Sequence, residues 1–425
     1  MKVYFLTREP FPNGMAATKR LLCYARALKN ENIESEILAI TRTETFDSNR
    51  NNFLPIGFAY DIKYVYIGGK TTRSKFRFMR FWDDQIDKLK TIIYLVKNIK
   101  CGDVVFFYCD SYLDFTLKVI QIFKQRRVSF VRELCELPFG TSKENKKSKH
   151  MRLKTFKRQF PLLDGFVCIS DSLYEEAKKY GKEDAEYIKI PILVDFDEYR
   201  LEDKSDCADV PYIFHSGTLY EQKDGILGML EAFGHAVKEL NIPMKFILTG
   251  RIEKSPHTRE INEIIAKYDM KDRVVFTGYL SNSDLKSYLS KASLVIINKY
   301  ETQQNKYCFS TKLGEYLAAA KPLIITSVGE ATNWLNNGES AYIVPPHDIN
   351  AMSKAIIHAM TNHDERKQIG LKGQFVCKES FDFKVWSKRF AHFLNNTIHC
   401  CPVKILKYHL SSNSRNSVLD IQALI

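Results

Sequence analysis

The stretch FSTKLGEYLAAAKPLIIT, residues 309–326, combines a helix pattern with a buried strand pattern. It predicts a short helix that carries Glu315 beside Gly314, followed at once by an apolar strand. A helix that only covered a sheet would gain nothing from a carboxylate next to a glycine. The group that Glu315 faces therefore decides how the stretch is interpreted.

Length and composition indicate a globular protein of two domains. A chain of 425 residues is too long for one ordinary core, which favours two domains of about 200 residues each. Hydrophobic content of 45% and aromatic content of 12% are globular values. No apolar run reaches the roughly 18 residues of a membrane span, and the N-terminal MKVYFLTREP lacks the apolar region of a signal peptide. We therefore expect a cytoplasmic protein.

The ten cysteines form no C-x-x-C pair and no cluster with histidine. This predicts neither a zinc site nor a disulfide framework, and it favours a reducing compartment. Cys168 lies inside the apolar run GFVCIS and is interpreted as a small core residue.

Strand and helix signals alternate along the chain. Apolar strand signals in the first half are KVYFL, ESEILAI, IKYVYI, DVVFFY, VSFVRE and GFVCIS; those in the second half are YIFHSG, KFILTG, RVVFTG, SLVIIN, PLIIT and AYIV. Amphipathic stretches such as AATKRLLCYARALKN separate them. Continuous apolar strands between helices predict parallel sheets covered on both faces. We expect two doubly wound α/β domains, residues 1–198 and 211–380, joined by a charged linker, residues 199–210.

Three strands of the second half end in glycine, at Gly217, Gly250 and Gly278. Glycine lets the backbone turn sharply and lets a ligand approach, so three on one edge predict a crevice for an extended ligand. Lys223 and Arg251 follow two of these strand ends, and cations near helix N-termini favour phosphate.

Glu315 lies four residues after Thr311, so the two share a helix face. If Ser310 and Thr311 hold a pyrophosphate, Glu315 lies one turn deeper. There it is expected to accept the hydroxyl groups of a ribose, as the acidic residue does in dinucleotide-binding folds.

At these residues the second domain resembles the donor-binding domain of family 4 retaining glycosyltransferases, which have the two-domain GT-B fold. The matching stretches are HSGTLYEQKDGILGMLEAF, VVFTGYLSNSDLKSYLSKASLVII, FSTKLGEYLAAAKPLIIT and GESAYIVPPHD. The first domain is similar more loosely, through PFPNGMAATKRLLCYARAL, FVCISDSLYEEAKKYG and IPILVDFDEY. The resemblance implies two Rossmann-like domains facing across a cleft. It also implies that residues 381–398 form a helix that crosses back to the first domain, and it leaves residues 399–425 as a tail without an assigned role.

Carried over residue by residue, the resemblance makes Glu315 the ribose ligand and Lys223 a cation on the diphosphate. Gly278 and Tyr279 would lie beside the nucleotide base. Gly14 would let a first-domain loop reach the transferred sugar. The full nucleotide-sugar site is expected to comprise Gly14, Gly217, Thr218, Lys223, Gly250, Arg251, Gly278, Tyr279, Tyr307, Phe309, Ser310, Thr311, Lys312, Leu313 and Glu315.

Two positions depart from the family pattern. The family commonly has a sugar-binding glutamate where this chain has Tyr307, and an arginine where it has Thr218. Arg251 could supply the missing positive charge. Tyr307 offers a stacking face, which predicts an N-acetylated or deoxy sugar rather than plain glucose.

The implied chemistry is transfer of a sugar from a nucleoside-diphosphate sugar with retention at the anomeric carbon. Such catalysis depends on positioning the reactants and on stabilising the charge of the leaving diphosphate. We therefore expect no metal and no cofactor besides the donor substrate. Lys223 and Arg251 are the catalytic cations. Glu133 ends a first-domain strand and is expected to bind an acceptor hydroxyl or to stabilise positive charge, although a structural capping role is equally compatible with its position.

Two basic segments, residues 70–80 and 143–158, carry nearly the whole net charge of +13. The first interleaves Phe76, Phe78, Phe81 and Trp82 with its cations, which is typical of segments at the level of lipid headgroups. We expect a peripheral association with the anionic inner face of the membrane, a polyprenyl-diphosphate-linked glycan as acceptor, and a role in building a surface polysaccharide such as a capsule.

Alternative functions are a GT-B-fold sugar-nucleotide epimerase, a nicotinamide-dependent dehydrogenase and a basic binding protein. The second domain lacks the G-x-G-x-x-G of a nicotinamide site, and no groove-reading module accompanies the basic segments, so we expect no nucleic-acid partner.

Overall fold

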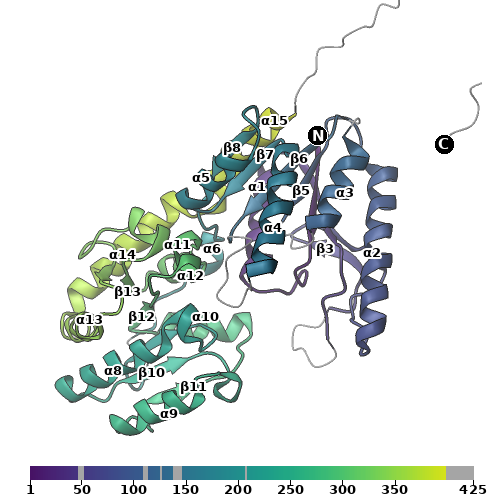
Figure 1. The fold of residues 1–425 in the computed structure, drawn as a ribbon. Coiled ribbons are helices and arrows are strands. Elements are labelled where there is room, and N and C mark those ends of the chain that lie inside the picture. Colours follow the sequence, from purple (N-terminus) through teal and green to yellow (C-terminus); the bar gives the residue numbers. More distant parts are fainter. Residues whose placement is uncertain (46–51, 109–112, 125–126, 137–145, 206–207, 399–425) are drawn as a thin grey trace, which may run out of the picture.

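The computed structural model describes residues 1–45, 52–108, 113–124, 127–136, 146–205 and 208–398. They form two α/β domains, each built on an open, mostly parallel sheet with helices on both faces (Figure 1). The prediction of two doubly wound domains is confirmed.

The first sheet has the strand order β3-β4-β2-β1-β5-β6-β7-β8. Its strands are β1 (Lys2–Thr7), β2 (Glu34–Ala39), β3 (Ile56–Ala59), β4 (Ile62–Tyr66), β5 (Val104–Phe107), β6 (Ser129–Leu134), β7 (Gly165–Cys168) and β8 (Glu186–Lys189). All neighbours pair in parallel except β3, which pairs antiparallel with β4. The edge strands β3 and β8 were not among the strand signals in the sequence.

Alternate side chains of the first sheet enter two apolar clusters. Tyr4 and Leu6 pack on the face covered by α2 (Arg77–Asn98), α3 (Leu113–Phe123), α4 (Lys146–Gln159) and α5 (Asp171–Tyr180). Val3 and Phe5 pack on the face covered by α1 (Ala16–Asn30) and by α15 (Phe383–Thr397). Cys168 is fully buried in this sheet, as predicted for a small core residue.

The second sheet has the order β11-β10-β9-β12-β13-β14. Its strands are β9 (Tyr212–His215), β10 (Lys245–Leu248), β11 (Val274–Phe276), β12 (Leu294–Ile297), β13 (Leu323–Thr326) and β14 (Tyr342–Val344). Helices α8 (Ile226–Leu240), α9 (Thr258–Lys267) and α13 (Ile349–Thr361) cover one face. The other face is covered by α10 (Asn282–Lys291), α12 (Lys312–Ala318) and α14 (His363–Ser380).

Helix α15 returns from the second domain to the first, where it lies beside α1 (Figure 1). The ring of Phe390 lies 4.9 Å from that of Tyr24 and 5.9 Å from that of Phe106. The end of the described chain is therefore part of the first-domain core. No helix in the described residues is long and apolar enough to cross a bilayer.

Candidate active site

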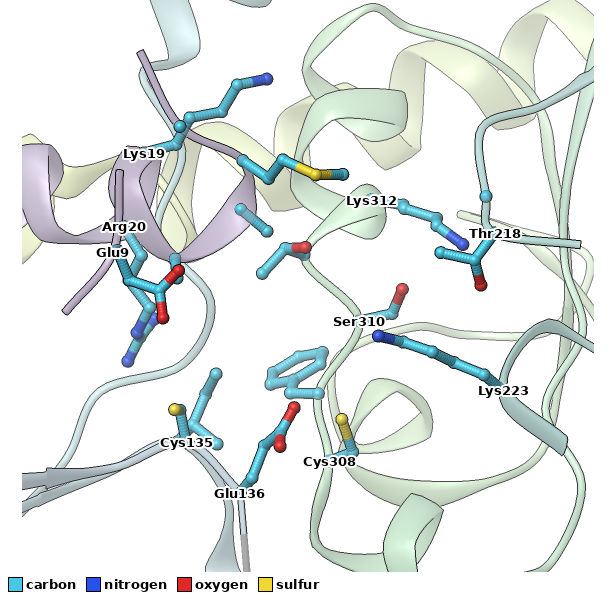
Figure 2. A pocket seen from close by; sticks show the side chains of 18 of the residues that line it. Glu9, Lys19, Arg20, Cys135, Glu136, Thr218, Lys223, Cys308, Ser310 and Lys312 are labelled. Atoms are coloured by element: carbon cyan, nitrogen blue, oxygen red, sulfur yellow. The ribbon is translucent and has the colours of Figure 1, made fainter. Parts of the chain in front are cut away.

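A cleft of ≈1610 Å³ lies between the two domains and is lined by both. Of the residues predicted for the donor site, those that line it are Gly14, Gly217, Thr218, Lys223, Gly250, Arg251, Gly278, Tyr279, Phe309, Ser310, Thr311, Lys312 and Glu315. Figure 2 shows Thr218, Lys223, Ser310 and Lys312 on the second-domain side of the cleft, with Glu9, Arg20 and Glu136 on the first-domain side. The sheet edges of both domains therefore contribute to one site.

The strand-end glycines form the wall of the second domain. Gly250 and Gly278 have φ angles of 101° and 71°, in the region that favours glycine, and the Gly250 N–H donates to the Gly278 carbonyl at 2.8 Å. A Cβ atom on Gly217 would lie 2.3 Å from Nε2 of His215. Gly217 has no room for a larger residue, Gly250 has little, and the backbone itself borders the cleft at these two positions.

Asp224 organises the cations of the donor wall. It ends the short helix α7 (Glu221–Asp224) and is 2% exposed. The Lys312 ammonium donates to its Oδ1, and the N–H and hydroxyl of Thr218 donate to its Oδ2 at 2.9 and 2.7 Å. Burial alone would raise the pKa of Asp224, but the positive charges of Lys312 and its neighbours lower it strongly, so the group stays ionised.

Lys299 approaches the same group from β12. Its Nζ lies 3.9 Å from Oδ1 of Asp224 and donates to the carbonyl of Lys223. Burial and the nearby Lys312 lower the pKa of Lys299. Lys223, Lys299 and Lys312 therefore bring three positive charges to one end of the cleft against the single charge of Asp224. Such an excess favours a polyanion.

Glu315 lies on the cleft side of α12 and is held from the first domain. Lys19 donates to its Oε1 at 2.7 Å, and the Tyr199 hydroxyl donates to the same oxygen at 3.0 Å. Tyr199 ends α6 (Phe196–Tyr199) in the connection between the domains. Both contacts use Oε1, so Oε2 remains for a hydroxyl group from the cleft.

Glu133 belongs to the lining of the cleft, but its side chain is buried. Its carboxylate has no exposed surface, and it accepts hydrogen bonds from Arg20 and from the Tyr24 hydroxyl, the latter at 2.9 Å. A fully buried and paired carboxylate does not fit direct contact with an acceptor. It instead holds the Arg20 guanidinium in the cleft wall. Two other first-domain carboxylates that line the cleft are Glu9 and Glu136, and burial together with the charge of Glu136 raises the pKa of Glu9.

Tyr307 and Leu313 were also predicted for the donor site, and the structure places both outside the lining of the cleft. Tyr307 ends α11 (Gln303–Tyr307), which packs against α5. Its carbonyl accepts from Ser170 at 3.1 Å, and its ring hydroxyl interacts with Glu176. Leu313 is fully buried in the apolar core. The preference for an N-acetylated or deoxy sugar that was inferred from Tyr307 stays a prediction.

The sequence interpretation missed Lys19, Arg20, Asp224 and Lys299. A signal for Lys19 was available, because a cation in the first turn of a helix is unfavourable for the helix dipole and needs another reason to be there. Asp224 and Lys299 gave no such signal, since their roles depend on pairs between distant segments. In the described residues no group of three or more His, Cys, Asp or Glu side chains could hold a metal ion.

Comparisons with known proteins show which family and which enzyme the second half of the chain resembles. Residues 210–362 match the family model described as "Glycosyl transferases group 1". The matched region contains most of the donor wall. A region of 162 residues is 21% identical to the alpha-D-kanosaminyltransferase of Streptomyces kanamyceticus and spans 39% of that enzyme's length and 38% of this chain.

Solved structures resemble the whole chain. Sucrose-phosphate synthase from Thermosynechococcus elongatus superposes with a TM-score of 0.69 at 16% identity, covering 92% of this chain and 98% of that one. Anabaena HepE in complex with UDP and glucose has a TM-score of 0.68 at 15% identity, with 93% and 99% covered. The pneumococcal O-GlcNAc transferase in complex with UDP and GlcNAc has a TM-score of 0.63 at 13% identity, with 94% and 99% covered. The fold is therefore GT-B, and residues 210–362 of the second domain are similar to the group 1 glycosyltransferases.

Proposed function

We propose that this protein is a retaining glycosyltransferase that moves a sugar from a nucleoside-diphosphate sugar to a glycan or a lipid-linked glycan. The observation that carries the proposal is the convergence of three lysines and Ser310 at one end of the cleft, with Glu315 one helical turn away. The lysines would bind a diphosphate, and the carboxylate of Glu315 would bind the ribose beside it.

In this assignment Lys223 and Lys312 bind the diphosphate, with Lys299 behind them and Arg251 at the neighbouring strand end. Oε2 of Glu315 accepts from a ribose hydroxyl. The nucleotide base lies towards Gly278 and Tyr279, where Gly278 has no side chain and its nearest neighbour would be Arg251, 4.0 Å from an added Cβ. The known donors of the structural relatives favour a uridine nucleotide as the first to test.

The reaction needs no protein nucleophile. The bond between the anomeric carbon and the diphosphate oxygen breaks, and the acceptor oxygen bonds to the same face of that carbon. The acceptor's hydroxyl proton passes to the departing diphosphate, which leaves as the free nucleoside diphosphate. The lysines lower the barrier because they stabilise the negative charge that develops on the leaving group.

The acceptor enters from the first domain, where Glu9 and Glu136 face the cleft. Carboxylates at this wall suit a hydroxyl-rich acceptor such as a growing glycan. We further propose that this glycan is carried on a polyprenyl diphosphate at the inner face of the membrane and belongs to a surface polysaccharide.

The test is a donor screen. The protein is incubated with a panel of nucleotide sugars, with and without lipid-linked glycan, and released nucleoside diphosphate is measured. Acceptor-dependent release and a product of unchanged anomeric configuration by NMR are expected. Conversion of the donor without acceptor would indicate an epimerase instead.

A matched pair of variants tests the site. Lys223→Ala should lower kcat by about 30- to 1000-fold, because a charge-assisted contact to the leaving group contributes about 2–4 kcal/mol in the transition state. Lys378→Ala removes an exposed lysine of α14, away from the cleft, and should leave kcat unchanged. Full activity of Lys223→Ala would overturn the assignment.

A further inference from the structure

Helix α2 exposes an apolar stripe along its whole length. Six side chains recur at alternating intervals of three and four residues, which places them on one face of the helix. They are Met79, Trp82, Ile86, Leu89, Ile93 and Val96, between 39% and 59% exposed. Soluble monomers rarely leave a continuous apolar stripe uncovered, so this face needs a partner.

The opposite face of α2 is the one turned to the protein. Its buried residues are Asp87, Thr91 and Leu95, two of them polar. Arg42 pairs with Asp87 at 3.3 Å and with Asp83 at 2.7 Å. An amphipathic helix ordinarily buries its apolar face in the core. The inward face of α2 is apolar only towards the end of the helix, where Ile92, Tyr94 and Leu95 pack on the core. The apolar stripe on the outward face stays exposed.

The exposed face of α2 is also cationic at its start. Phe76, Phe78 and Phe81 are 57–72% exposed, and they alternate with Arg77 and Arg80. Neither arginine forms an ion pair within the described residues. Since Arg42 draws two of the acidic side chains inward, the outward surface presents apolar groups, aromatic rings and positive charge together.

We propose that α2 is a membrane-docking helix that lies flat on a bilayer containing anionic lipids. The stripe from Met79 to Val96 is about 26 Å long at 1.5 Å per residue, and it would enter the boundary between headgroups and acyl chains. Arg77 and Arg80 would contact lipid phosphates. Charge favours this partner over a second copy of α2, which would bring two cationic surfaces together.

Docking through α2 has a defined geometric consequence. Figure 1 shows α2 at the outer edge of the first domain, on the side away from the second domain. Lys88, on the inward side of the same helix, lines the interdomain cleft. The cleft would therefore lie beside the bilayer, while the donor wall stays open to water. The inference stands independently of the proposed transfer reaction.

Co-sedimentation with vesicles tests the proposal without any sugar donor. The full-length protein should bind phosphatidylcholine vesicles that contain phosphatidylglycerol, should bind pure phosphatidylcholine much more weakly, and should be released by salt. The variant Ile86→Gln/Leu89→Gln/Ile93→Gln should reduce partition at least about tenfold, because it removes most of the apolar area that enters the bilayer. Leu371→Gln/Phe375→Gln is the matched control, since both side chains are exposed on α14 of the second domain, and its binding should equal the wild type.

Two matched variants that remove positive charge, together with a fluorescence signal, make the test specific. Arg77→Gln/Arg80→Gln should weaken binding by about fivefold per cation removed, whereas Lys372→Gln/Lys378→Gln on α14 should not. Trp82 is 52% exposed, so vesicle binding should shift the tryptophan emission to the blue, and Trp82→Phe should abolish the shift.

Two results would overturn the proposal. One is equal partition of the wild type and the stripe variant, with circular dichroism showing both folded. The other is a wild-type dimer in lipid-free solution that the stripe variant dissociates, which would assign the face to a second copy. Because no transfer is measured, either failure leaves the proposed reaction untouched.

Discussion

His215 and Asp224 lie under the glycine loop that ends β9, and they set the charge of the donor wall. His215 is completely buried, and Nδ1 donates to the Ile296 carbonyl at 2.8 Å. Nε2 is buried too and has no hydrogen-bond partner within the described residues. Burial, reinforced by the positive charge of Lys312, lowers the pKa of His215 to about 3. The ring therefore stays neutral beside the lysines.

This residue predicts a pH dependence of stability. The folded pKa of about 3 lies below the ordinary 6.5, so the unfolded chain binds more protons between these values and stability falls as pH falls below 6.5. His215→Gln should remove this part of the decline, about 2–3 kcal/mol between about pH 6.5 and 4.5. Urea unfolding of both proteins at pH 6.5 and 4.5 measures this difference in the free energy of unfolding. His235→Gln, at an exposed ring, should keep the wild-type profile. An unchanged profile in His215→Gln would show that the buried ring does not titrate as described.

Glu315 leads to a second prediction at this scale. Glu315→Ala should raise the donor KM by about 10- to 100-fold with a smaller change in kcat, because hydrogen bonds to a charged group contribute about 1.5–3 kcal/mol. Tyr199→Phe removes one of the two bonds that hold Oε1 and should raise KM less, with kcat unchanged. Steady-state kinetics over a range of donor concentrations separates the effect on KM from the effect on kcat. A fall in kcat at constant KM would place Glu315 in the chemical step instead.

The sequence predicted those site residues whose chemistry is local. Strand ends and helix positions were enough to predict Gly250, Lys223 and Glu315. All three residues line the cleft. The pairing of Glu133 was not predicted, because its place at a strand end says nothing about Arg20, which reaches it from 113 residues away. Distant pairs of this kind have no signature in a single sequence.

The sequence predicted the central strands of the first sheet and every strand of the second, including its edges β11 and β14. The signals used were continuous apolar runs, which mark strands covered on both faces. The two edges of the first sheet lack such runs. Side chains of β3 alternate between exposed and half-buried, and those of β8 are all half-buried. For α2 the pattern identifies an apolar face but not the direction in which that face points.

The turns after the second-domain strands give a prediction at the element scale. A Cβ atom on Gly250 would lie 3.1 Å from both the Gly217 carbonyl oxygen and Leu219, at a φ of 101°. Gly250→Ala should destabilise the protein by about 2–3 kcal/mol and weaken donor binding. Gly102→Ala is the matched control, because Gly102 has a φ of 84° with nothing within 4 Å, and it should cost about 1 kcal/mol. Urea unfolding and nucleotide titration measure both effects. Equal costs would mean that crowding at the strand end is unimportant.

Over the whole molecule, the two domains are joined by more than the linker. One apolar cluster runs from the first sheet through Val194 and Phe309 to Phe381. Glu330 accepts from Lys189 at 2.9 Å and from the Asp171 N–H at 3.1 Å. We propose that residues 1–198 and 211–380 are nevertheless the two folding units, with α15 completing the first. The first unit then depends on the end of the chain.

That dependence can be tested at Phe390. Its ring is fully buried between Tyr24 and Phe106 of the first domain, so Phe390→Ala should lower the free energy of unfolding by about 3–5 kcal/mol. Phe375→Ala makes the same chemical change at a ring that is 66% exposed on α14, and its cost should stay within about 0.5 kcal/mol. Calorimetry with and without nucleoside diphosphate assigns the loss to a domain, because a ligand of the second domain raises the melting temperature of that domain only. In Phe390→Ala the transition that the nucleotide does not shift should move to lower temperature. If only the nucleotide-sensitive transition moves, α15 belongs energetically to the second domain, and the crossing is a contact between domains rather than part of the first core.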